Sequence, residues 1–209
     1  MKIVCLDLEG VLVPEIWINL AKRTGIGELR ATTRDVPDYD ELMTQRLALL
    51  DRHGLGLDDI QAAVESMGPL SGARRFLDRL REKNQVVILS DTFYEFVEPL
   101  MIQLGRPTLF CHRIEAAADG QIVDYHLRLP DHKRQAVAAF KNLNFPVVAV
   151  GDSYNDIAML HEADSGILFH APQWIAEEYP SFRSLQTFEE LESALSDESE
   201  PRKTPAEKV

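Results

Sequence analysis

Short apolar runs alternate along the chain with longer segments whose apolar residues recur at helical spacing. The apolar runs are Lys2–Leu8 and the stretches QVVILS, PVVAV and GILFH, at residues 85–90, 146–150 and 166–170. Between them lie amphipathic segments that we predict to be helices, such as GARRFLDRLREKN and HKRQAVAAFKNL. Buried strands that alternate with helices are typical of a parallel sheet with helices on both faces. The pattern therefore predicts an α/β fold.

Two interruptions of this alternation define the expected domain organisation. Residues 15–69 have helical patterns throughout, so we expect a small helical cap inserted into a Rossmann-like core, which is formed by residues 1–14 and 70–196. Within the core, two extended runs flank Asp119–Gly120, which predicts a β-hairpin insert at about 108–128.

The C-terminal part of the sequence predicts one more helix and then a tail. Thr187 and Glu190 form a T-x-x-E capping box, which is typical of a helix N-terminus. Residues 197–209 are rich in charge and proline and lack aromatic side chains, so we expect a disordered tail there.

The charge balance narrows the range of partners. The 209 residues carry a formal charge of −12, which argues against nucleic acid or an anionic membrane but leaves room for a local site that binds a small anion. No stretch approaches the ~20 apolar residues of a membrane span, and no secretory signal pattern opens the sequence. Cys5 and Cys111 lack paired metal-type spacing, which argues against zinc and favours a reduced, cytoplasmic protein. We expect a monomer or a homodimer.

Polar residues follow the three strongest predicted strands, at the point where each strand ends. They are Asp7 and Glu9 after the first strand, Ser90 and Asp91 after the second, and Asp152, Ser153, Asn155 and Asp156 after the third. In parallel sheets, ligands bind beyond the carboxyl ends of the strands. If the three strands are neighbours, these residues converge on one crevice.

Several carboxylates in one crevice would repel one another unless a cation lies between them. Oxygen ligands suit Mg²⁺, which typically binds one or two carboxylates together with phosphate. One carboxylate could then attack phosphorus and form an aspartyl phosphate, while a second, two residues further on, protonates the leaving oxygen. Ser90 and Lys133 would supply a hydroxyl group and a positive charge for the phosphoryl oxygens. The residues thus indicate Mg²⁺-dependent phosphoryl transfer from a small molecule.

These residues resemble the motifs of a known enzyme family. DLEG at Asp7–Gly10, Ser90, Lys133, and GDSYND at Gly151–Asp156 resemble, in order and spacing, the four motifs of the haloacid dehalogenase superfamily. The resemblance extends to about residue 190. The helical insertion, with TQRLALL at Thr44–Leu50, is similar to the cap of the phosphoserine phosphatase branch. GDSYND after an apolar strand is specific, whereas a lone lysine would carry little weight.

The resemblance implies catalytic and metal-binding roles for four acidic residues. Asp7 would be the nucleophile and a Mg²⁺ ligand. Glu9 would act as acid and base through its side chain, and its backbone carbonyl would bind the metal. Asp152 would complete the protein ligands of the metal, and Asp156 would support them.

The resemblance also implies substrate-binding roles. Ser90 and Lys133 would hold the phosphate, with Asn155 close to it. From the helical cap, Arg46 would bind the substrate carboxylate, because a guanidinium group matches a carboxylate with two hydrogen bonds. Glu15 would meet the substrate amino group.

Three positions depart from the family pattern. Glu9 stands where the family usually has Asp, Val11 where it usually has Thr, and Asp91–Thr92 where phosphoserine phosphatases usually have glycines. As a whole, the sequence is most similar to a small subgroup that hydrolyses phosphoserine and also transfers its phosphoryl group to homoserine. The resemblance therefore implies phosphoserine as the substrate, with water or homoserine as the acceptor.

Some residues keep an alternative interpretation. Ser90 could cap a following helix as well as bind phosphate, and Asp91 could be either a capping acid or a substrate contact. The histidines are scattered along the sequence, and we interpret four of them as structural or surface residues: His112, His126, His132 and His170.

Two other functions remain possible from the sequence. A receiver-type signalling module is also α/β, Mg²⁺-dependent and phosphorylated on Asp, but its Asp follows a middle strand and no helical insertion interrupts its first crossover. Asp7 on the first strand and the long insertion therefore argue against it. The second alternative is a phosphatase of the same superfamily for another small phosphomonoester, such as a sugar phosphate or a nucleotide. If turnover of phosphoserine requires Arg46, the substrate is an amino-acid phosphate and not a sugar phosphate or a nucleotide.

Overall fold

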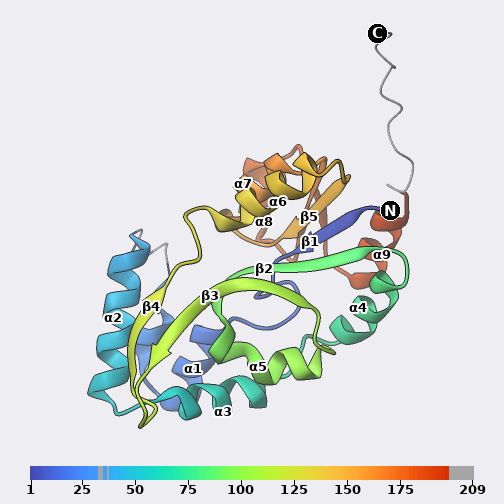
Figure 1. Cartoon of the computed structure of the whole chain (residues 1–209). Coiled ribbons are helices and arrows are strands. Elements are labelled where there is room, and N and C mark those ends of the chain that lie inside the picture. Colours follow the sequence, from blue (N-terminus) through green and yellow to red (C-terminus); the bar gives the residue numbers. More distant parts are fainter. Residues whose placement is uncertain (33–34, 37, 198–209) are drawn as a thin grey trace.

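One seven-stranded sheet forms the centre of the molecule. The computed structural model describes residues 1–32, 35–36 and 38–197. The strands are β1 Ile3–Leu6, β2 Gln85–Phe93, β3 Thr108–Ala116, β4 Ile122–His126, β5 Val147–Gly151, β6 Ser165–Phe169 and β7 Arg183–Leu185. Their order is β4-β3-β2-β1-β5-β6-β7, and within the described ranges neighbouring strands run parallel except β3 and β4. The predicted α/β fold is confirmed (Figure 1).

Helices cover both faces of this sheet. They are α4 Ala73–Arg81, α5 Tyr94–Gln103, α6 His132–Asn142, α7 Ile157–Glu162, α8 Gln173–Glu178 and α9 Phe188–Asp197, with a 3-10 helix, η2, at Tyr154–Asp156. Alternate residues of a strand point to opposite faces. Val4 and Leu6 of β1 accordingly join the apolar cluster that includes α4, α5 and α9, whereas Ile3 and Cys5 join the cluster that includes α6, α7 and α8. Figure 1 shows these two groups of helices on either side of the sheet.

The strands that end in polar residues are neighbours. β1 lies between β2 and β5, and its last residue, Leu6, is level with Ile88 of β2 and Val150 of β5. All residues of β1 and β5 are buried, as expected for parallel strands covered on both faces. The carboxyl ends of β1, β2 and β5 therefore meet at one edge of the sheet.

A group of helices precedes α4 in the sequence and lies beside the hairpin formed by β3 and β4 (Figure 1). It consists of α1 Ile16–Thr24, the 3-10 helix η1 Gly27–Arg30, α2 Tyr39–Arg52 and α3 Leu57–Met67. The hairpin turns at Asp119–Gly120, as predicted, and Gly120 has the positive φ of 87° that such a turn requires.

Hydrogen bonds hold these helices against the hairpin at two points. The Tyr125 hydroxyl of β4 donates to Asp40 Oδ1 of α2 at 2.5 Å. At the hairpin turn, the Gly120 carbonyl accepts the Leu57 backbone N–H, the first of α3, at 2.9 Å. Both ends of the short strand β4 are thus attached to the helices that follow β1.

Strand β2 is longer than the sequence predicted. It runs to Phe93 instead of ending at Ser90, because a shift of register between Leu89 and Phe93 lets it continue beside β3. Helix α5 begins only at Tyr94 and has no side-chain cap. The interpretations of Ser90 as a helix cap and of Asp91 as a capping acid are therefore wrong.

The C-terminal segment agrees with the sequence except for one helix. The capping box is confirmed, since the Glu190 N–H donates to Thr187 Oγ1 at 3.2 Å and the Thr187 N–H donates to Glu190 Oε2 at 3.1 Å. The short helix α8 was not predicted. Beyond Asp197, the predicted tail lies outside the described residues. In the ranges that the structure covers, no helix combines the length and the apolar character needed to cross a membrane.

Gly56, in the connection between α2 and α3, provides a test of the packing against the hairpin. A Cβ atom at Gly56 would lie 2.9 Å from the Gly120 carbonyl oxygen, although the Gly56 φ of −99° is open to any residue. We expect Gly56→Ala to lower the free energy of unfolding by about 1–3 kcal/mol, because the backbone must shift to make room. Gly27→Ala is the control, since nothing lies within 4 Å of its Cβ position, and should change it by less than about 0.5 kcal/mol. Urea unfolding measures both, and equal effects would contradict the close packing.

Candidate active site

Asp7 lies at the carboxyl end of β1, in the middle of the sheet. Its backbone N–H donates to the Val150 carbonyl at 2.9 Å, which continues the pairing with β5 by one residue, and its side chain is buried. The turn that follows requires glycine. Gly10 has a φ of 76°, and a Cβ atom there would lie 2.4 Å from the Asp152 carboxyl group. Glycine therefore lets the loop after β1 lie directly against Asp152.

Lys133, near the start of α6, is surrounded by three carboxylates. Its Nζ lies 3.0 Å from Asp7 Oδ1, 2.8 Å from Asp156 Oδ1 and 3.2 Å from Asp91 Oδ2. The side chain is only 3 % exposed. Burial lowers the pKa of Lys133, but the three carboxylates outweigh it and raise the pKa well above its usual value. The ammonium group donates hydrogen bonds to Asp7 and Asp156, and it forms an ion pair with Asp91.

Asp7, Asp152 and Asp156 form a second cluster on the same side of the sheet. One carboxylate oxygen from each lies within 4.8 Å of the other two. Asp156 is fully occupied, because its Oδ2 also accepts the backbone N–H groups of Asp152 at 3.0 Å and Ser153 at 3.2 Å. Burial, together with the charge of Asp156, raises the pKa of Asp7 well above its usual range and that of Asp152 to about 7.

This donor set fits a divalent cation. The raised pKa values express the cost of burying Asp7 and Asp152 beside the charge of Asp156. The groups are carboxylate oxygens, without nitrogen or sulfur, which is the ligand type of Mg²⁺. Since Asp156 is bonded to Lys133 and to backbone amides, Asp7 and Asp152 are the carboxylates able to hold the ion.

Glu9 is turned toward the first helix after β1. Its Oε2 accepts the backbone N–H of Ile16, the first residue of α1, at 2.8 Å. Burial, followed by the charge of Glu15, raises the pKa of Glu9 to about 8. A carboxyl group with this pKa carries a proton at neutral pH and is suited to act as a general acid.

Arg46 of α2 extends the site into the helical segment. It is buried, with its guanidinium 4.4 Å from the centre of the Trp17 ring and Nη2 donating to the Ala31 carbonyl at 2.9 Å. Among the described residues its Nε has no partner. Burial lowers the pKa of Arg46, and the charges of Tyr39, Glu9 and Glu15 oppose this effect. Glu15 directly precedes α1, whose first N–H is bonded to Glu9.

The remaining predicted residues lie at the ends of β2 and β5. Ser90 is buried, and its Oγ accepts the Thr92 backbone N–H at 3.3 Å. Asn155 Nδ2 donates to Asp91 Oδ2 at 2.8 Å, the oxygen that also meets Lys133. Asp7, Asp91, Asn155 and Asp156 are thus linked to one another through Lys133 and Asp91, with Asp152 beside them.

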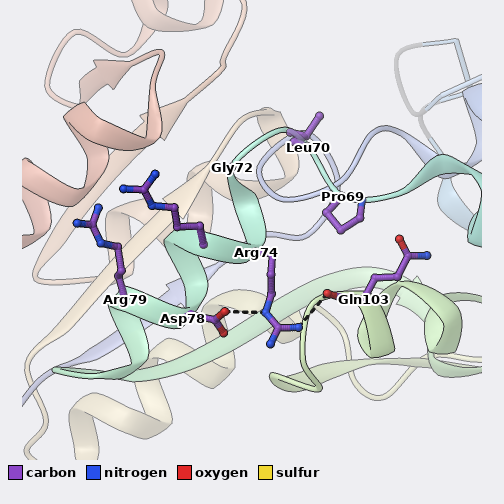
Figure 2. A pocket seen from close by; sticks show the side chains of 8 residues that line it. Pro69, Leu70, Gly72, Arg74, Asp78, Arg79 and Gln103 are labelled. Atoms are coloured by element: carbon purple, nitrogen blue, oxygen red, sulfur yellow. Dashed lines mark hydrogen bonds and ion pairs between the residues drawn. The ribbon is translucent and has the colours of Figure 1, made fainter.

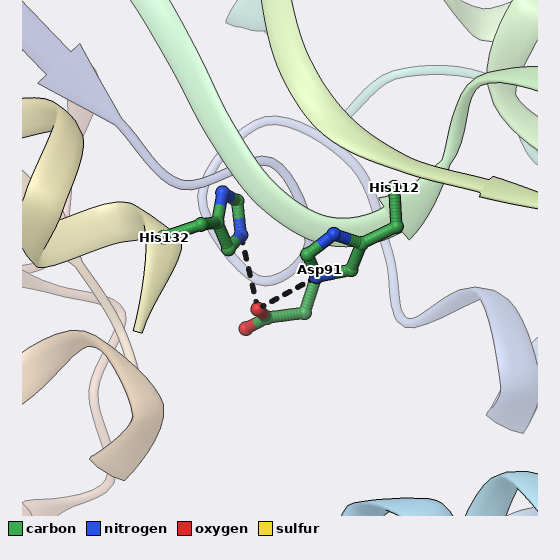
Figure 3. Close-up of side chains that lie close together, drawn as sticks. All are labelled: Asp91, His112 and His132. Atoms are coloured by element: carbon green, nitrogen blue, oxygen red, sulfur yellow. Dashed lines mark hydrogen bonds and ion pairs between the residues drawn. The ribbon is translucent and has the colours of Figure 1, made fainter. Parts of the chain in front are cut away.

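Two of the histidines that we interpreted from the sequence as structural or surface residues are buried in the same region. Figure 3 shows His112 of β3 and His132 of α6 on either side of Asp91. Their Nε2 atoms lie 3.6 Å and 3.1 Å from Asp91 Oδ1, and their ring centres are 4.4 Å apart. Treating them as scattered was wrong. His112 is level with Phe93 of β2, so the strand-end rule would have found it had the order of the strands been known.

A separate groove lies along α4 (Figure 2). It is lined by Pro69, Leu70, Gly72, Arg74, Arg75, Asp78, Arg79 and Gln103, none of which is a predicted site residue. Arg74 within it is bonded to Asp78 at 2.8 Å and to the Gln103 carbonyl at 3.0 Å.

The fold and the acidic site define a class of hydrolase, and comparison with known proteins agrees. Residues 1–164 match the family of haloacid dehalogenase-like hydrolases. The chain belongs to this family, as its motifs indicated.

Relatives of high identity carry one name. Over 191 residues the chain is 61 % identical to a phosphoserine phosphatase of Pseudomonas syringae pv. tomato, which covers 91 % of this chain and 81 % of that protein. It is 60 % identical to the phosphoserine phosphatase ThrH of Pseudomonas aeruginosa, with 91 % of this chain and 93 % of that protein covered.

Solved structures share the fold at lower identity. A crystal structure of phosphoserine phosphatase in apo form matches with a TM-score of 0.73 and 22 % identity, covering 93 % of this chain and 98 % of that one. A phospho-aspartyl intermediate analogue of phosphoserine phosphatase matches with a TM-score of 0.75 and 22 % identity, covering 92 % and 98 %.

Replacing Lys133 tests how far the site depends on its charge. We expect Lys133→Met to lower the free energy of unfolding by about 3–5 kcal/mol, because it leaves buried carboxylates without their positive partner. Lys141→Met, on the same helix, removes a lysine that lies 3.4 Å from Asp164 and is 33 % exposed. That control should cost at most about 1 kcal/mol. Denaturant unfolding in EDTA compares the two, and similar losses would show that the Lys133 charge is unimportant for stability.

Proposed function

We propose that this protein is a Mg²⁺-dependent phosphoserine phosphatase that works through an aspartyl phosphate on Asp7. The observation that carries the proposal is the setting of Asp7, which lies 3.0 Å from the Lys133 ammonium group and within 4.8 Å of Asp152. A nucleophilic carboxylate needs positive groups for the phosphoryl oxygens that approach it, and this setting offers them. The relatives of about 60 % identity named phosphoserine phosphatase support the choice of substrate.

The reaction follows from the positions of the two acids after β1. Asp7 attacks the phosphorus, and the bond between phosphorus and the serine oxygen breaks while Glu9 protonates that oxygen. Glu9, fixed by the N–H of Ile16 at 2.8 Å, then takes a proton from water, which attacks the acyl phosphate and releases phosphate from Asp7. Mg²⁺ held by Asp7, Asp152 and the Glu9 carbonyl would supply charge neutralisation at the phosphoryl oxygens.

Residues on both sides of the site divide the recognition of phosphoserine. Ser90, Lys133 and Asn155 hold the phosphoryl group. Arg46 binds the substrate carboxylate, and Glu15 binds the substrate ammonium group. Each charge of the amino-acid part thus has a protein group of opposite charge. In this arrangement residues 15–69 act as a cap over a core made of residues 1–14 and 70–196, and closure of the cap excludes water from the first step.

A second acceptor is part of the proposal. The resemblance to the subgroup that transfers phosphate to homoserine, together with Glu9 in place of the usual Asp, supports the homoserine hydroxyl as an alternative to water. Glu9 would deprotonate that hydroxyl in the same position. Asp7 on the first strand, with the helical segment after it, favours an enzyme over a phosphorylated receiver module.

The test is phosphate release from phosphoserine with Mg²⁺ and with EDTA. We expect multiple turnovers that EDTA abolishes and that Asp7→Asn reduces by at least about 10³-fold, since the nucleophile is lost. Adding homoserine should produce phosphohomoserine. Turnover of other phosphomonoesters but not of phosphoserine would refute the substrate, whereas absence of phosphohomoserine would remove only the transfer reaction.

Arg46 distinguishes an amino-acid substrate from other phosphate esters. We expect Arg46→Ala to lower kcat/KM for phosphoserine by about 10–100-fold while changing that for p-nitrophenyl phosphate, which has no carboxylate, by less than about threefold. Arg52→Ala, at the exposed end of the same helix, is the matched control and should leave both unchanged. Equal losses for both substrates would mean that Arg46 only maintains the fold of α2.

A further inference from the structure

The Asp91 carboxylate meets four polar side chains from three different parts of the chain, two through hydrogen bonds and two at ion-pair distance. Oδ1 lies 3.1 Å from His132 Nε2, within hydrogen-bond distance, and 3.6 Å from His112 Nε2. Figure 3 shows both contacts as dashed lines. Oδ2 accepts Asn155 Nδ2 at 2.8 Å and lies 3.2 Å from Lys133 Nζ. Both carboxylate oxygens thus accept a hydrogen bond within the protein, and the carboxylate already faces the buried ammonium group of Lys133. Asp91 is therefore poorly suited to bind a substrate ammonium group, although it is 35 % exposed.

The protonation of His112 follows from its second nitrogen. His112 Nδ1 accepts the backbone N–H of Arg128 at 3.1 Å, so in the neutral ring the proton must be on Nε2, which faces Asp91. A metal ion bound at Nε2 would require the proton on Nδ1, where it would oppose the Arg128 N–H. With a proton on His112 Nε2 directed at Asp91, the group of Asp91, His112 and His132 does not suit a metal ion.

His132 holds its position at a cost to stability. Its Nε2 meets Asp91, and its Nδ1 is buried without a partner among the described residues. Burial lowers the pKa of His132, so the ring is neutral and Nδ1 is an unsatisfied acceptor. A leucine at this position would avoid that penalty. The Nε2 bond to Asp91 is what a leucine could not supply, so the contribution of the histidine lies in that bond.

Asp91 is one of the three carboxylates that surround the Lys133 ammonium group. Two of these carboxylates, Asp7 and Asp156, also belong to the acidic cluster with Asp152. Asp91 comes from β2 and is not part of that cluster. Without Asp91, Lys133 would be drawn toward Asp7 and Asp156 alone. Asn155 would lose its partner at the same time.

We propose that Asp91 positions Lys133 and Asn155 for the phosphoryl group, and that His112 and His132 are positioning residues that act through Asp91. This rests on the proposed function only in that Lys133 and Asn155 hold the phosphoryl group. It predicts an effect common to every phosphate ester, whereas a contact from Asp91 to the amino-acid part of the substrate would affect phosphoserine alone.

The first experiment compares Asp91→Asn with wild type on phosphoserine and on p-nitrophenyl phosphate. We expect kcat to fall by about 10–100-fold, and by a similar factor for the two substrates. The reason is that displacing the Lys133 ammonium group by ~1 Å from the reacting phosphoryl group lowers the rate. A loss confined to phosphoserine would assign Asp91 to substrate binding and overturn the proposal. Activity within twofold of wild type on both would overturn it as well.

The second experiment separates positioning from folding at His132. His132→Leu removes the unsatisfied nitrogen together with the Nε2 bond to Asp91, two effects of similar size and opposite sign. We therefore expect a melting temperature close to that of wild type with a kcat lowered about tenfold on both substrates. His132→Gln returns an N–H donor near the place of Nε2 and should recover most of the loss. Unaltered kcat in His132→Leu, or no recovery with glutamine, would contradict the role.

Controls and a binding readout complete the test. The pair His126 and Glu115, 3.2 Å apart and both more than half exposed, lies on the same hairpin, so the double variant with glutamine at both positions should behave as wild type. Calorimetry with inorganic phosphate and Mg²⁺ needs no turnover, and His132→Leu should weaken binding about fivefold. Unchanged phosphate binding would sink the proposal. Failure of wild type on phosphoserine alone would instead refute the proposed substrate.

Discussion

A buried ammonium group among carboxylates is the interaction on which the rest of the site depends. Lys133 is 3 % exposed and within 3.2 Å of Asp7, Asp91 and Asp156. One positive charge cannot balance these acids together with Asp152, so the apoprotein keeps an excess of negative charge where the three strands end. A divalent cation and the arrangement of donors around Asp91 are two answers to that single electrostatic problem.

Close approach of backbone and carboxylate makes this density of charge possible. At Gly10 a Cβ atom would lie 2.4 Å from Asp152 Oδ2, and at Gly151 it would lie 2.3 Å from Asp156 Cβ. The absence of a side chain at Gly10 and Gly151 therefore leaves the space that the carboxylates of Asp152 and Asp156 occupy. Asp156 uses the space to bind two backbone N–H groups, which fixes the loop that carries Asp152.

The sequence predicted those features that depend on neighbouring residues in the chain, and it missed those that depend on pairing between distant segments. Asp7, Ser90 and Asp152 each follow an apolar run, so the geometry of parallel sheets was enough to predict that they meet. His112 lies on an apolar run of the hairpin, whose place beside β2 is set by pairing between distant segments, and nothing local marks it. The extension of β2 to Phe93 depends on the same pairing. Arg46 was found only through resemblance, because an arginine on a helix is most often a surface residue.

The attachment of the hairpin to the helices links two parts of the molecule that appear separate in the sequence. The turn at Gly120 is bonded to Leu57, and the paired strand β3 carries His112, whose ring faces Asp91. Strand β3 thus joins the turn that is bonded to α3 with the ring that faces Asp91. For protein engineering, the helical segment is not an independent module. Grafting it onto another core of this family requires transplanting the hairpin with it, because the bonds of Tyr125 to Asp40 and of Gly120 to Leu57 would otherwise be lost.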